Sequence, residues 1–463
     1  MSKSFSVGYF PTSFPRDPVE INVFLEHILI GQILEPLVVS KTDGSIVPGV
    51  AARWEISSDS KEIRFYIEKG LKFSNGRSVT AKDVKYSLMR HISSNSSQSR
   101  VYLNKISKIK VIGSNKIIIH LESPYFAILK ALSRDHLGIV PYGWKFDASS
   151  SEPFTGTGAY RAVRLDKNWC LIKNNFYKNT KKVEIKKWKI NFIGKSSQYL
   201  LNAPVPDLIP LSFPEQTNIL AKREKFEMIK EEIIHFFQSS AWWYPHGSTF
   251  EDKNRRILGM QAVRALIQFR IKKLKLKAAT GIIPEGVEGS FSKPISVRLT
   301  KGLGKVSNRR FSFAVLKREY ESICDSADIA AVEKKYDIQF DIFSFEAPQF
   351  KNLLSLRPDI VLFAFAGAFH DPEGFVTVVS SMLSEKLGRL FGIAYPLYLK
   401  ASAEINSNLR DKKYKKLNKF LVQSLQMVPG WRIEVSRLIK NNIYLNDDDF
   451  CFTPKLKNYK SKL

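Results

Sequence analysis

Three consecutive aromatic residues, Trp242, Trp243 and Tyr244, are the first group in this sequence whose chemistry suggests binding. Indole and phenol rings offer large apolar faces with one polar atom each, so they can stack on a bound molecule or fill a core. Two further rings, Phe365 and Phe369, lie within a run of small apolar residues. Ligand stacking and core packing are both open for these five side chains.

Residues that catalyse reactions are present, but not in a recognisable arrangement. The sequence has no G-x-S-x-G, no H-E-x-x-H and no G-x-x-x-x-G-K-[ST], and Gly156-Thr157-Gly158 lacks the third glycine of a dinucleotide-binding loop. The seven histidines show no metal-ligand spacing. His370 and Asp371 are adjacent, so on a turn their side chains point apart. We therefore expect a protein that is not an enzyme, with no metal site and no cofactor.

The cysteines and the chain start bear on the compartment. Cys170, Cys324 and Cys451 are odd in number and far apart, so no disulfide framework is expected, and Cys170 fits a buried free thiol. The segment from Met1 to Phe10 lacks the apolar core of a secretory signal and has the pattern of a strand. Either a leader has been removed or the protein stays in the cytoplasm.

Charge is the most extreme compositional feature, with 72 Lys and Arg against 44 Asp and Glu, a net +28. Such a field attracts anions, anionic lipids and nucleic acids. The basic residues are spread along the chain, and no nucleic-acid recognition module surrounds them. We expect mainly solvated basic faces, with a dock for an acidic partner or a membrane surface as the alternative, and no nucleic-acid binding.

Length and hydrophobicity indicate a large globular protein. The 463 residues, 44% of them hydrophobic, can bury a sizeable core and correspond to about three domain-sized units. No window approaches the roughly 18 consecutive apolar residues of a membrane span. The chain should therefore form several packed domains and no membrane helix.

Local patterns predict several elements. Asp43-Gly44 and Asn75-Gly76 lie between apolar runs and favour hairpin turns. Residues 62–68 alternate between apolar and polar, as in a strand with one buried face. The capping-box pattern Thr80-x-x-Asp83 predicts a helix from Ala81 to about Arg90. We also expect a helix from about Val23 to Leu34, a strand over Lys116–Leu121, a helix beginning near Pro124 and strands between Tyr160 and Phe192.

The order of these turns and caps resembles the family 5 extracellular solute-binding proteins, which serve peptide, nickel and related ABC importers. The resemblance covers nearly the whole chain and is strongest over residues 35–87. Gly156–Tyr160 resembles the family's G-T-G-P-Y segment, with Ala159 in place of proline. Looser matches follow at Met260–Ile267, Ile283–Gly286, Tyr336–Phe340, Asp359–Phe363 and the D-P-x-x-F turn at Asp371–Phe375.

The resemblance implies a mixed α/β, two-lobed fold of the periplasmic-binding-protein type, with three domains and a ligand cleft between the lobes. The implied division is domain one over 1–42, 155–245 and 431–463, domain two over 43–154, and domain three over 246–430. Hinge strands near Ser239–Tyr244 and Val428–Trp431 would let the lobes close on a solute.

The implied function is the substrate-binding component of an ABC importer. It would work as a monomer in the periplasm, or attached outside the cytoplasmic membrane, with permease subunits as partners. The alternative is an intracellular ligand sensor, because the fold also resembles the sensing half of some transcription regulators. Sequence upstream of Met1 would separate the two, since an apolar leader supports the importer and a DNA-binding domain supports the sensor.

The resemblance also places candidate ligand residues in a run from Phe363 to Phe369. Peptide-binding relatives carry an aspartate three residues before the D-P turn, where it pairs with the peptide's amino terminus. Counted back from Asp371, that position is Ala368 here, unless the register is shifted. Losing one partner of a buried charge pair costs about 2 to 5 kcal/mol. A free-amino peptide is therefore not expected. The small, apolar run from Phe363 to Phe369 would form a wall of the cleft that suits an uncharged or apolar group.

Overall fold

A computed structural model describes most of the 463 residues. The described ranges are 4–9, 14–21, 24–41, 43–97, 99–165, 168–192, 202, 204–212, 214–223, 226–230, 237–243, 253–297, 306–317, 323–345, 356–366, 371–376, 394–433, 435–445 and 455–461. The chain divides into two units, Met1–Ile233 with Glu434–Leu463 as unit 1 and Ile234–Ile433 as unit 2. Unit 2 is thus inserted between two parts of unit 1.

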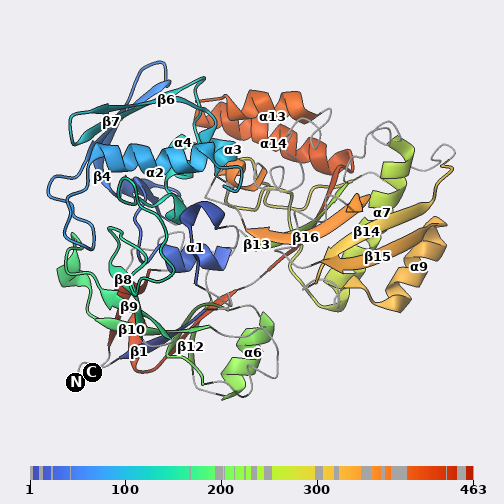
Figure 1. Ribbon diagram of the computed structural model, residues 1–463. Helices are drawn as coiled ribbons and strands as arrows, with labels where there is room; N and C mark the ends of the chain where they lie inside the picture. Colours follow the sequence, from blue (N-terminus) through green and yellow to red (C-terminus); the bar gives the residue numbers. More distant parts are fainter. Residues whose placement is uncertain are drawn as a thin grey trace. The chain divides into compact units, whose positions relative to one another are not determined.

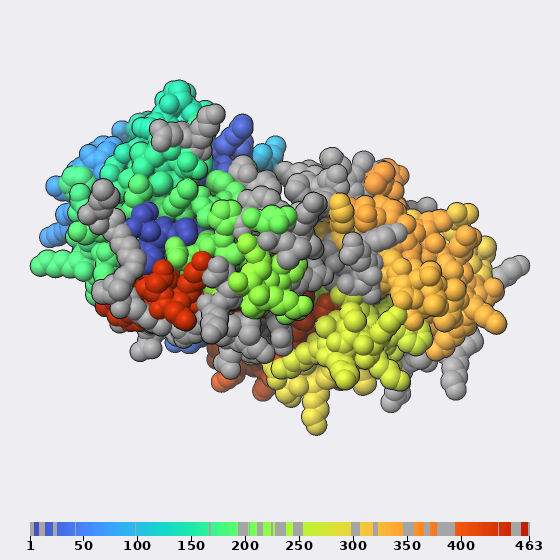
Figure 2. Space-filling model, turned by 90° about the horizontal axis from the view of Figure 1, so that it is seen from below, coloured from blue at the N-terminus to red at the C-terminus, as the bar shows by residue number. Residues whose placement is uncertain are grey.

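The larger sheet of unit 1 has the strand order β12-β18-β11-β1-β10-β9-β8. Its strands are β1 (Phe5–Tyr9), β8 (Tyr160–Leu165), β9 (Asn168–Lys173), β10 (Lys187–Phe192), β11 (Leu208–Ser212), β12 (Phe226–Lys230) and β18 (Ser436–Lys440). The strands expected between Tyr160 and Phe192 are confirmed. Both chain ends lie beside this sheet in Figure 1, and Figure 2 shows red C-terminal atoms beside dark blue N-terminal ones. Distant stretches of sequence therefore share one sheet.

The second sheet of unit 1 has the order β4-β5-β7-β6. Its strands are β4 (Ala51–Ile56), β5 (Glu62–Ile67), β6 (Ile106–Ile112) and β7 (Lys116–Leu121). In β5, Ile63, Phe65 and Ile67 are buried while the residues between them are not, which confirms the predicted alternation. Helix α2 (Ala81–Ser93) packs against β6 and β7.

Smaller elements complete unit 1. They are the helices α1 (Phe24–Ile30), α3 (Arg100–Leu103), α4 (Ile128–Leu132) and α6 (Pro214–Arg223), the pairs β2 (Val38–Ser40) with β3 (Ile46–Pro48) and β19 (Ile443–Leu445) with β20 (Tyr459–Ser461), and 3-10 turns at Pro18–Glu20, Asp135–Leu137, Thr180–Lys182 and Leu456–Asn458. The helix expected near Pro124 begins four residues later, at Ile128.

The predicted turns and the predicted cap are confirmed. Gly44 and Gly76 have φ angles of 81° and 85°, which glycine adopts without strain. The Thr80 backbone N–H donates to Asp83 Oδ2 at 2.8 Å, and α2 begins at Ala81 as expected and ends at residue 93, three residues later than expected. The buried Asp83 carboxylate also accepts from the Tyr142 N–H at 2.7 Å. One cap residue thus joins α2 to a segment far along the chain.

Helix α1 is shorter than expected, ending at residue 30 rather than at Leu34. The carbonyl of Ile33 instead accepts a hydrogen bond from the Gly158 N–H at 2.8 Å. A Cβ atom on Gly156 would lie 2.2 Å from the Ile33 oxygen, so only glycine allows this approach. The G-T-G motif therefore packs backbone against backbone where α1 ends.

Unit 2 contains one five-stranded sheet of order β15-β14-β16-β13-β17. Its elements are β13 (Phe237–Trp243), β14 (Arg310–Leu316), β15 (Gln339–Phe345), β16 (Ile360–Ala366) and β17 (Met427–Arg432), with helices α7 (Lys253–Lys273), α9 (Ser326–Tyr336), α13 (Tyr395–Ser402) and α14 (Ser407–Gln423). β14 is parallel to β15 and β16, whereas β13 is antiparallel to β16 and β17. β15 and β16 overlap the looser family matches at Tyr336–Phe340 and Asp359–Phe363.

Helix α7 is fastened to this sheet by a buried ion pair. Arg255 Nη1 and Nη2 lie 2.6 and 3.0 Å from the two oxygens of Asp359. Asp359 Oδ2 also accepts from the Ser312 N–H at 3.0 Å, in the neighbouring strand. Burial alone would raise the pKa of Asp359, but hydrogen bonds from Arg255 and Ser312 hold it below its usual value. The carboxylate therefore stays charged and binds the helix to two strands.

The expected division into three domains stays a prediction, because the two units do not test it. The separation of residues 43–154 as a domain of their own stays a prediction. The segments expected to act as hinges fall largely in β13 and β17, which pair with each other inside unit 2. Their hinge role also stays a prediction.

Three histidines of unit 1 form a buried cluster. The ring of His136 lies 4.4 Å from that of His27 and 5.4 Å from that of His91, measured between centroids. Ser97 Oγ is 2.9 Å from His91 Nδ1, and Ser99 Oγ is 2.7 Å from His136 Nε2. Burial first, and nearby arginine charges second, lower the pKa of all three imidazoles, that of His91 to about 3. The cluster is therefore neutral at physiological pH.

We expect unit 1 to lose stability as the pH falls below about 6.5, the usual pKa of histidine in an unfolded chain. Because the folded-state pKa of His91 is about 3, the unfolded chain binds more protons between these two values, and acid favours unfolding. His91 alone should lower the free energy of unfolding by about 2 kcal/mol at pH 5 relative to pH 7. Urea unfolding at pH 7 and at pH 5 measures this difference.

Two matched variants test the assignment. In His91→Gln, the decrease in the free energy of unfolding between pH 7 and pH 5 should be about 2 kcal/mol smaller than in the parent chain. Lys108→Gln, at an exposed position in β6, should lose as much as the parent chain. Equal losses in all three proteins would contradict a role for His91.

Candidate ligand-binding site

The D-P turn lies in unit 2, after the strand at the middle of the sheet. β16 is hydrogen-bonded to β14 on one side and to β13 on the other. Residues 367–370, which include Ala368 and Phe369, lie outside the described residues, and the described chain resumes at Asp371. The candidate segment is therefore bounded by a central strand before it and by the D-P turn after it.

The D-P turn is fixed by a buried arginine. Arg410 of α14 donates to Asp371 through Nη2 to Oδ1 at 2.7 Å and through Nη1 to Oδ2 at 3.1 Å, and both side chains are fully buried. Arg410 Nη1 also donates to Glu288. Such two-pronged pairs fix geometry as well as adding energy. Burial alone would lower the pKa of Arg410, but Asp371 raises it above its usual range, so the guanidinium stays charged.

A second buried carboxylate completes the anchor. Glu373 accepts hydrogen bonds from the hydroxyl of Tyr398 in α13, at 3.0 Å, and from that of Tyr414 in α14. The Arg410 guanidinium carbon lies 4.8 Å from the centre of the Tyr414 ring. Burial and the charge of Glu373 raise the pKa of Tyr414 well above its usual value, so the phenol stays protonated and donates. The turn is therefore tied to two helices.

The two tryptophans expected as ligand candidates lie inside unit 2. The Trp242 ring is fully buried, 6.1 Å from the Phe363 ring, and its Nε1 donates to Ser240 Oγ at 2.6 Å. The ring of Trp243, only 6% exposed, lies 6.3 Å from that of Phe311. These contacts agree with the core-packing alternative. A ligand-stacking role for either ring stays a prediction.

The remaining expected residues are only partly placed. The backbone of Phe365 lies in β16, paired with that of Gln238 in β13. Tyr244, Ala368 and Phe369 lie outside the described residues, so their ligand roles stay predictions. The structure therefore describes the strand before residues 367–370 and the turn after them, but not these residues themselves.

Sequence reasoning missed Arg410 and Tyr414, although a signal was present. Arg410 opens a stretch dense in lysine, which was interpreted as a solvated basic face. Yet Arg410, Tyr414 and Leu417 follow one another at helical spacing and are all fully buried. An arginine at the same spacing as buried apolar residues indicates a buried guanidinium that pairs with a carboxylate through two hydrogen bonds. A lysine could not form such a two-pronged pair.

Two kinds of feature are absent from the described residues. No group of three or more His, Cys, Asp or Glu side chains among them is arranged to hold a metal ion. No helix among them combines the length and apolar character needed to cross a membrane. Cys170 and Cys324 are free thiols, and Cys451 lies outside the described ranges.

Sequence comparison places the chain among solute-binding proteins. Residues 45–244 match the family described as "Bacterial extracellular solute-binding proteins, family 5 Middle". The periplasmic murein peptide-binding protein MppA of Escherichia coli is 22% identical over 92% of this chain and 86% of its own length. The periplasmic oligopeptide-binding protein OppA of Haemophilus influenzae is 33% identical over 24% of this chain and 20% of its own.

Solved structures share the fold over the whole chain. The E. coli murein tripeptide-binding protein MppA superposes with a TM-score of 0.76 at 17% identity, covering 99% of this chain and 98% of its own. H. influenzae OppA in complex with RPPGFSPFR gives 0.77 at 18% identity, covering 99% of both chains. AgaA from A. tumefaciens, in complex with agropinic acid, gives 0.78 at 19%, covering 100% and 99%. The two-lobed fold expected from the sequence is thereby confirmed, and the resemblance to the family 5 solute-binding proteins is confirmed by the match over residues 45–244.

Proposed function

We propose that this chain is the substrate-binding component of an ABC importer. The observation that carries the proposal is the end-to-end agreement in fold with ligand-bound solute-binding proteins, together with the family match over residues 45–244. In this role the protein works outside the cytoplasmic membrane as a monomer and performs no chemistry on its ligand. It captures a small solute by hinge closure of two lobes and delivers it to membrane permease subunits.

The ligand class is narrower than the fold alone allows. Relatives are named for murein peptides, oligopeptides and nickel, and one is solved with agropinic acid, so the fold accommodates different chemistries. Ala368 stands where the family's peptide binders are expected to carry a carboxylate. The two carboxylates of the following turn, Asp371 and Glu373, already accept hydrogen bonds from Arg410 and from two phenols. The proposed solute is therefore uncharged or apolar at the end that faces Ala368.

Native mass spectrometry of the protein, purified without refolding, tests this function. We expect one retained small molecule per chain, released on denaturation, with a mass and fragmentation that exclude a free-amino oligopeptide. Small-angle scattering should show a smaller radius of gyration for the loaded than for the stripped protein, because closure compacts such proteins. A retained free-amino oligopeptide would refute the argument from Ala368 and leave the importer role intact. Identical scattering with and without the retained molecule would contradict capture by closure.

Restoring a carboxylate tests the ligand class from the other direction. Ala368→Asp should increase the affinity for trialanine by about tenfold or more, because a buried ammonium would gain its counter-ion. N-acetyl-trialanine, which lacks the ammonium, should gain nothing. Isothermal titration with both peptides measures the difference.

The uncharged isostere Ala368→Asn is the matched control, since it has the size of aspartate without the charge. It should bind trialanine as the parent chain does. The assignment of position 368 is wrong if aspartate and asparagine act alike, or if the parent chain already prefers trialanine to its acetylated form.

Removing Arg410 tests the anchor of the candidate segment. Arg410→Met leaves Asp371 buried without its cation, which should lower the free energy of unfolding of unit 2 by about 3 to 5 kcal/mol. Arg410→Lys keeps the charge but not the fork, so an intermediate loss is expected. Urea unfolding followed by tryptophan fluorescence measures this loss; three of the seven tryptophans, Trp242, Trp243 and Trp431, lie in unit 2 and the other four in unit 1.

Lys415→Met in the same helix removes a charge of the same sign from an exposed pair with Asp411, 2.7 Å long. Its cost should stay below about 0.5 kcal/mol. Should Arg410→Met cost no more than Lys415→Met, the buried fork would not be what holds the turn.

A further inference from the structure

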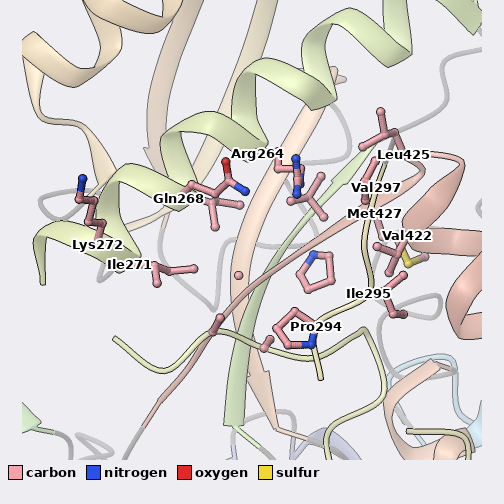
Figure 3. A pocket seen from close by; sticks show the side chains of 16 residues that line it. Arg264, Gln268, Ile271, Lys272, Pro294, Ile295, Val297, Val422, Leu425 and Met427 are labelled. Carbon is pink, nitrogen blue, oxygen red and sulfur yellow. The ribbon is translucent and has the colours of Figure 1, made fainter. Parts of the chain in front are cut away.

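A cavity of about 320 Å³ lies within unit 2, separate from the D-P turn. It is bordered by the second half of α7, by the end of α14 with the start of β17, and by the segments around residues 278–279 and 294–297 (Figure 3). Among the residues that the structure describes, none of β16 or of the D-P turn lines it. The cavity is therefore a feature distinct from the candidate ligand site.

Small residues on a fixed backbone keep this space open. Ala278, Ala279 and Gly430 contribute little or no side chain to the wall. The Ala279 N–H donates to the Gly430 carbonyl at 3.0 Å, and the Ile295 N–H donates to the Thr280 carbonyl at 3.0 Å. Because these walls are joined through backbone hydrogen bonds, they cannot collapse by a change of rotamer.

The wall of the cavity is otherwise apolar. Ile267 and Ile271 face it from α7, and Ile295, Val422 and Met427 border it from other segments. Figure 3 shows the side chains of Ile271, Ile295, Val422 and Met427 around a common space. An engineered cavity of about 150 Å³ with a comparable lining holds benzene. About twice that volume accommodates an apolar body of roughly eight to twelve non-hydrogen atoms.

One side of the cavity is cationic. Arg264, Gln268 and Lys272 are spaced four residues apart, so they form a stripe along α7, and all three border the cavity. In the part of the chain that the structure describes, no carboxylate pairs with Arg264 or with Lys272, and the lining contains no acidic residue. The next residue, Lys273, is by contrast paired with Asp325 at 2.6 Å.

From this combination we propose that the cavity binds an amphipathic carboxylate with an aliphatic body of about eight carbons. The carboxylate meets Arg264, Lys272 adds positive charge two turns further along α7, and the chain lies against Ile267, Ile271 and Met427. An amine is disfavoured because the two cations would repel it with no acidic side chain in the lining to offset them. The inference does not depend on the identity of the solute proposed above.

Isothermal titration of the full chain with sodium octanoate tests the proposal. Saturable binding of one octanoate per chain is expected, with octanol at least about tenfold weaker because it lacks the charge. Arg264→Gln combined with Lys272→Gln should weaken octanoate by about tenfold or more. Lys273→Gln, which removes a charge of the same sign from the same helix, should leave the affinity unchanged.

A filling variant locates the binding. Ala278→Phe, at a half-buried wall position, should abolish octanoate binding while the melting temperature stays close to that of the parent chain. Octanoate that binds Ala278→Phe as it binds the parent chain would occupy another site and overturn the proposal. No saturable binding of octanoate to the parent chain, or equal affinities for octanoate and octanol, would overturn it as well.

Discussion

The two-pronged ion pair between Arg410 and Asp371 is the interaction on which the proposed binding surface depends. Both side chains are fully buried, so each charge needs the other. Desolvation offsets most of the attraction in such pairs, and their net contribution to stability is small. What the pair supplies is position. It fixes Asp371, the first residue of the D-P turn, which follows the candidate ligand segment in the sequence.

The same network constrains ligand charge. Asp371 and Glu373 are the described carboxylates nearest in sequence to Ala368, and both accept hydrogen bonds from protein donors. A ligand ammonium placed nearby would compete with a guanidinium that is permanently charged and with a phenol that stays protonated. Asp371 and Glu373 thus offer a ligand ammonium no free carboxylate to take the place of the one that Ala368 lacks.

Local chemistry was predictable, and contacts between distant segments were not. The turns at Gly44 and Gly76 and the cap at Thr80 depend on neighbours within a few residues, and each was located correctly. The end of α1 was missed because it depends on Gly158, far along the chain. Trp242 and Trp243 stayed ambiguous because a large ring suits a core and a ligand equally well. Only their contacts with Phe363 and Phe311 place them in a core.

The cationic side chains of unit 2 discussed above occur in two different settings. Arg255 and Arg410 are buried and forked onto carboxylates, where a lysine could not provide the same geometry. In a chain with a net charge of +28, cations without a partner are unavoidable, so an unpaired lysine or arginine alone carries no information about function. Arg264 and Lys272 differ because they border an apolar cavity, and the described residues of its lining include no carboxylate to neutralise them. The apolar walls of the cavity have a low dielectric constant, so they strengthen the attraction between these cations and a bound anion. The binding role is therefore supported by the position of the two cations beside the cavity and not by the net charge of the chain.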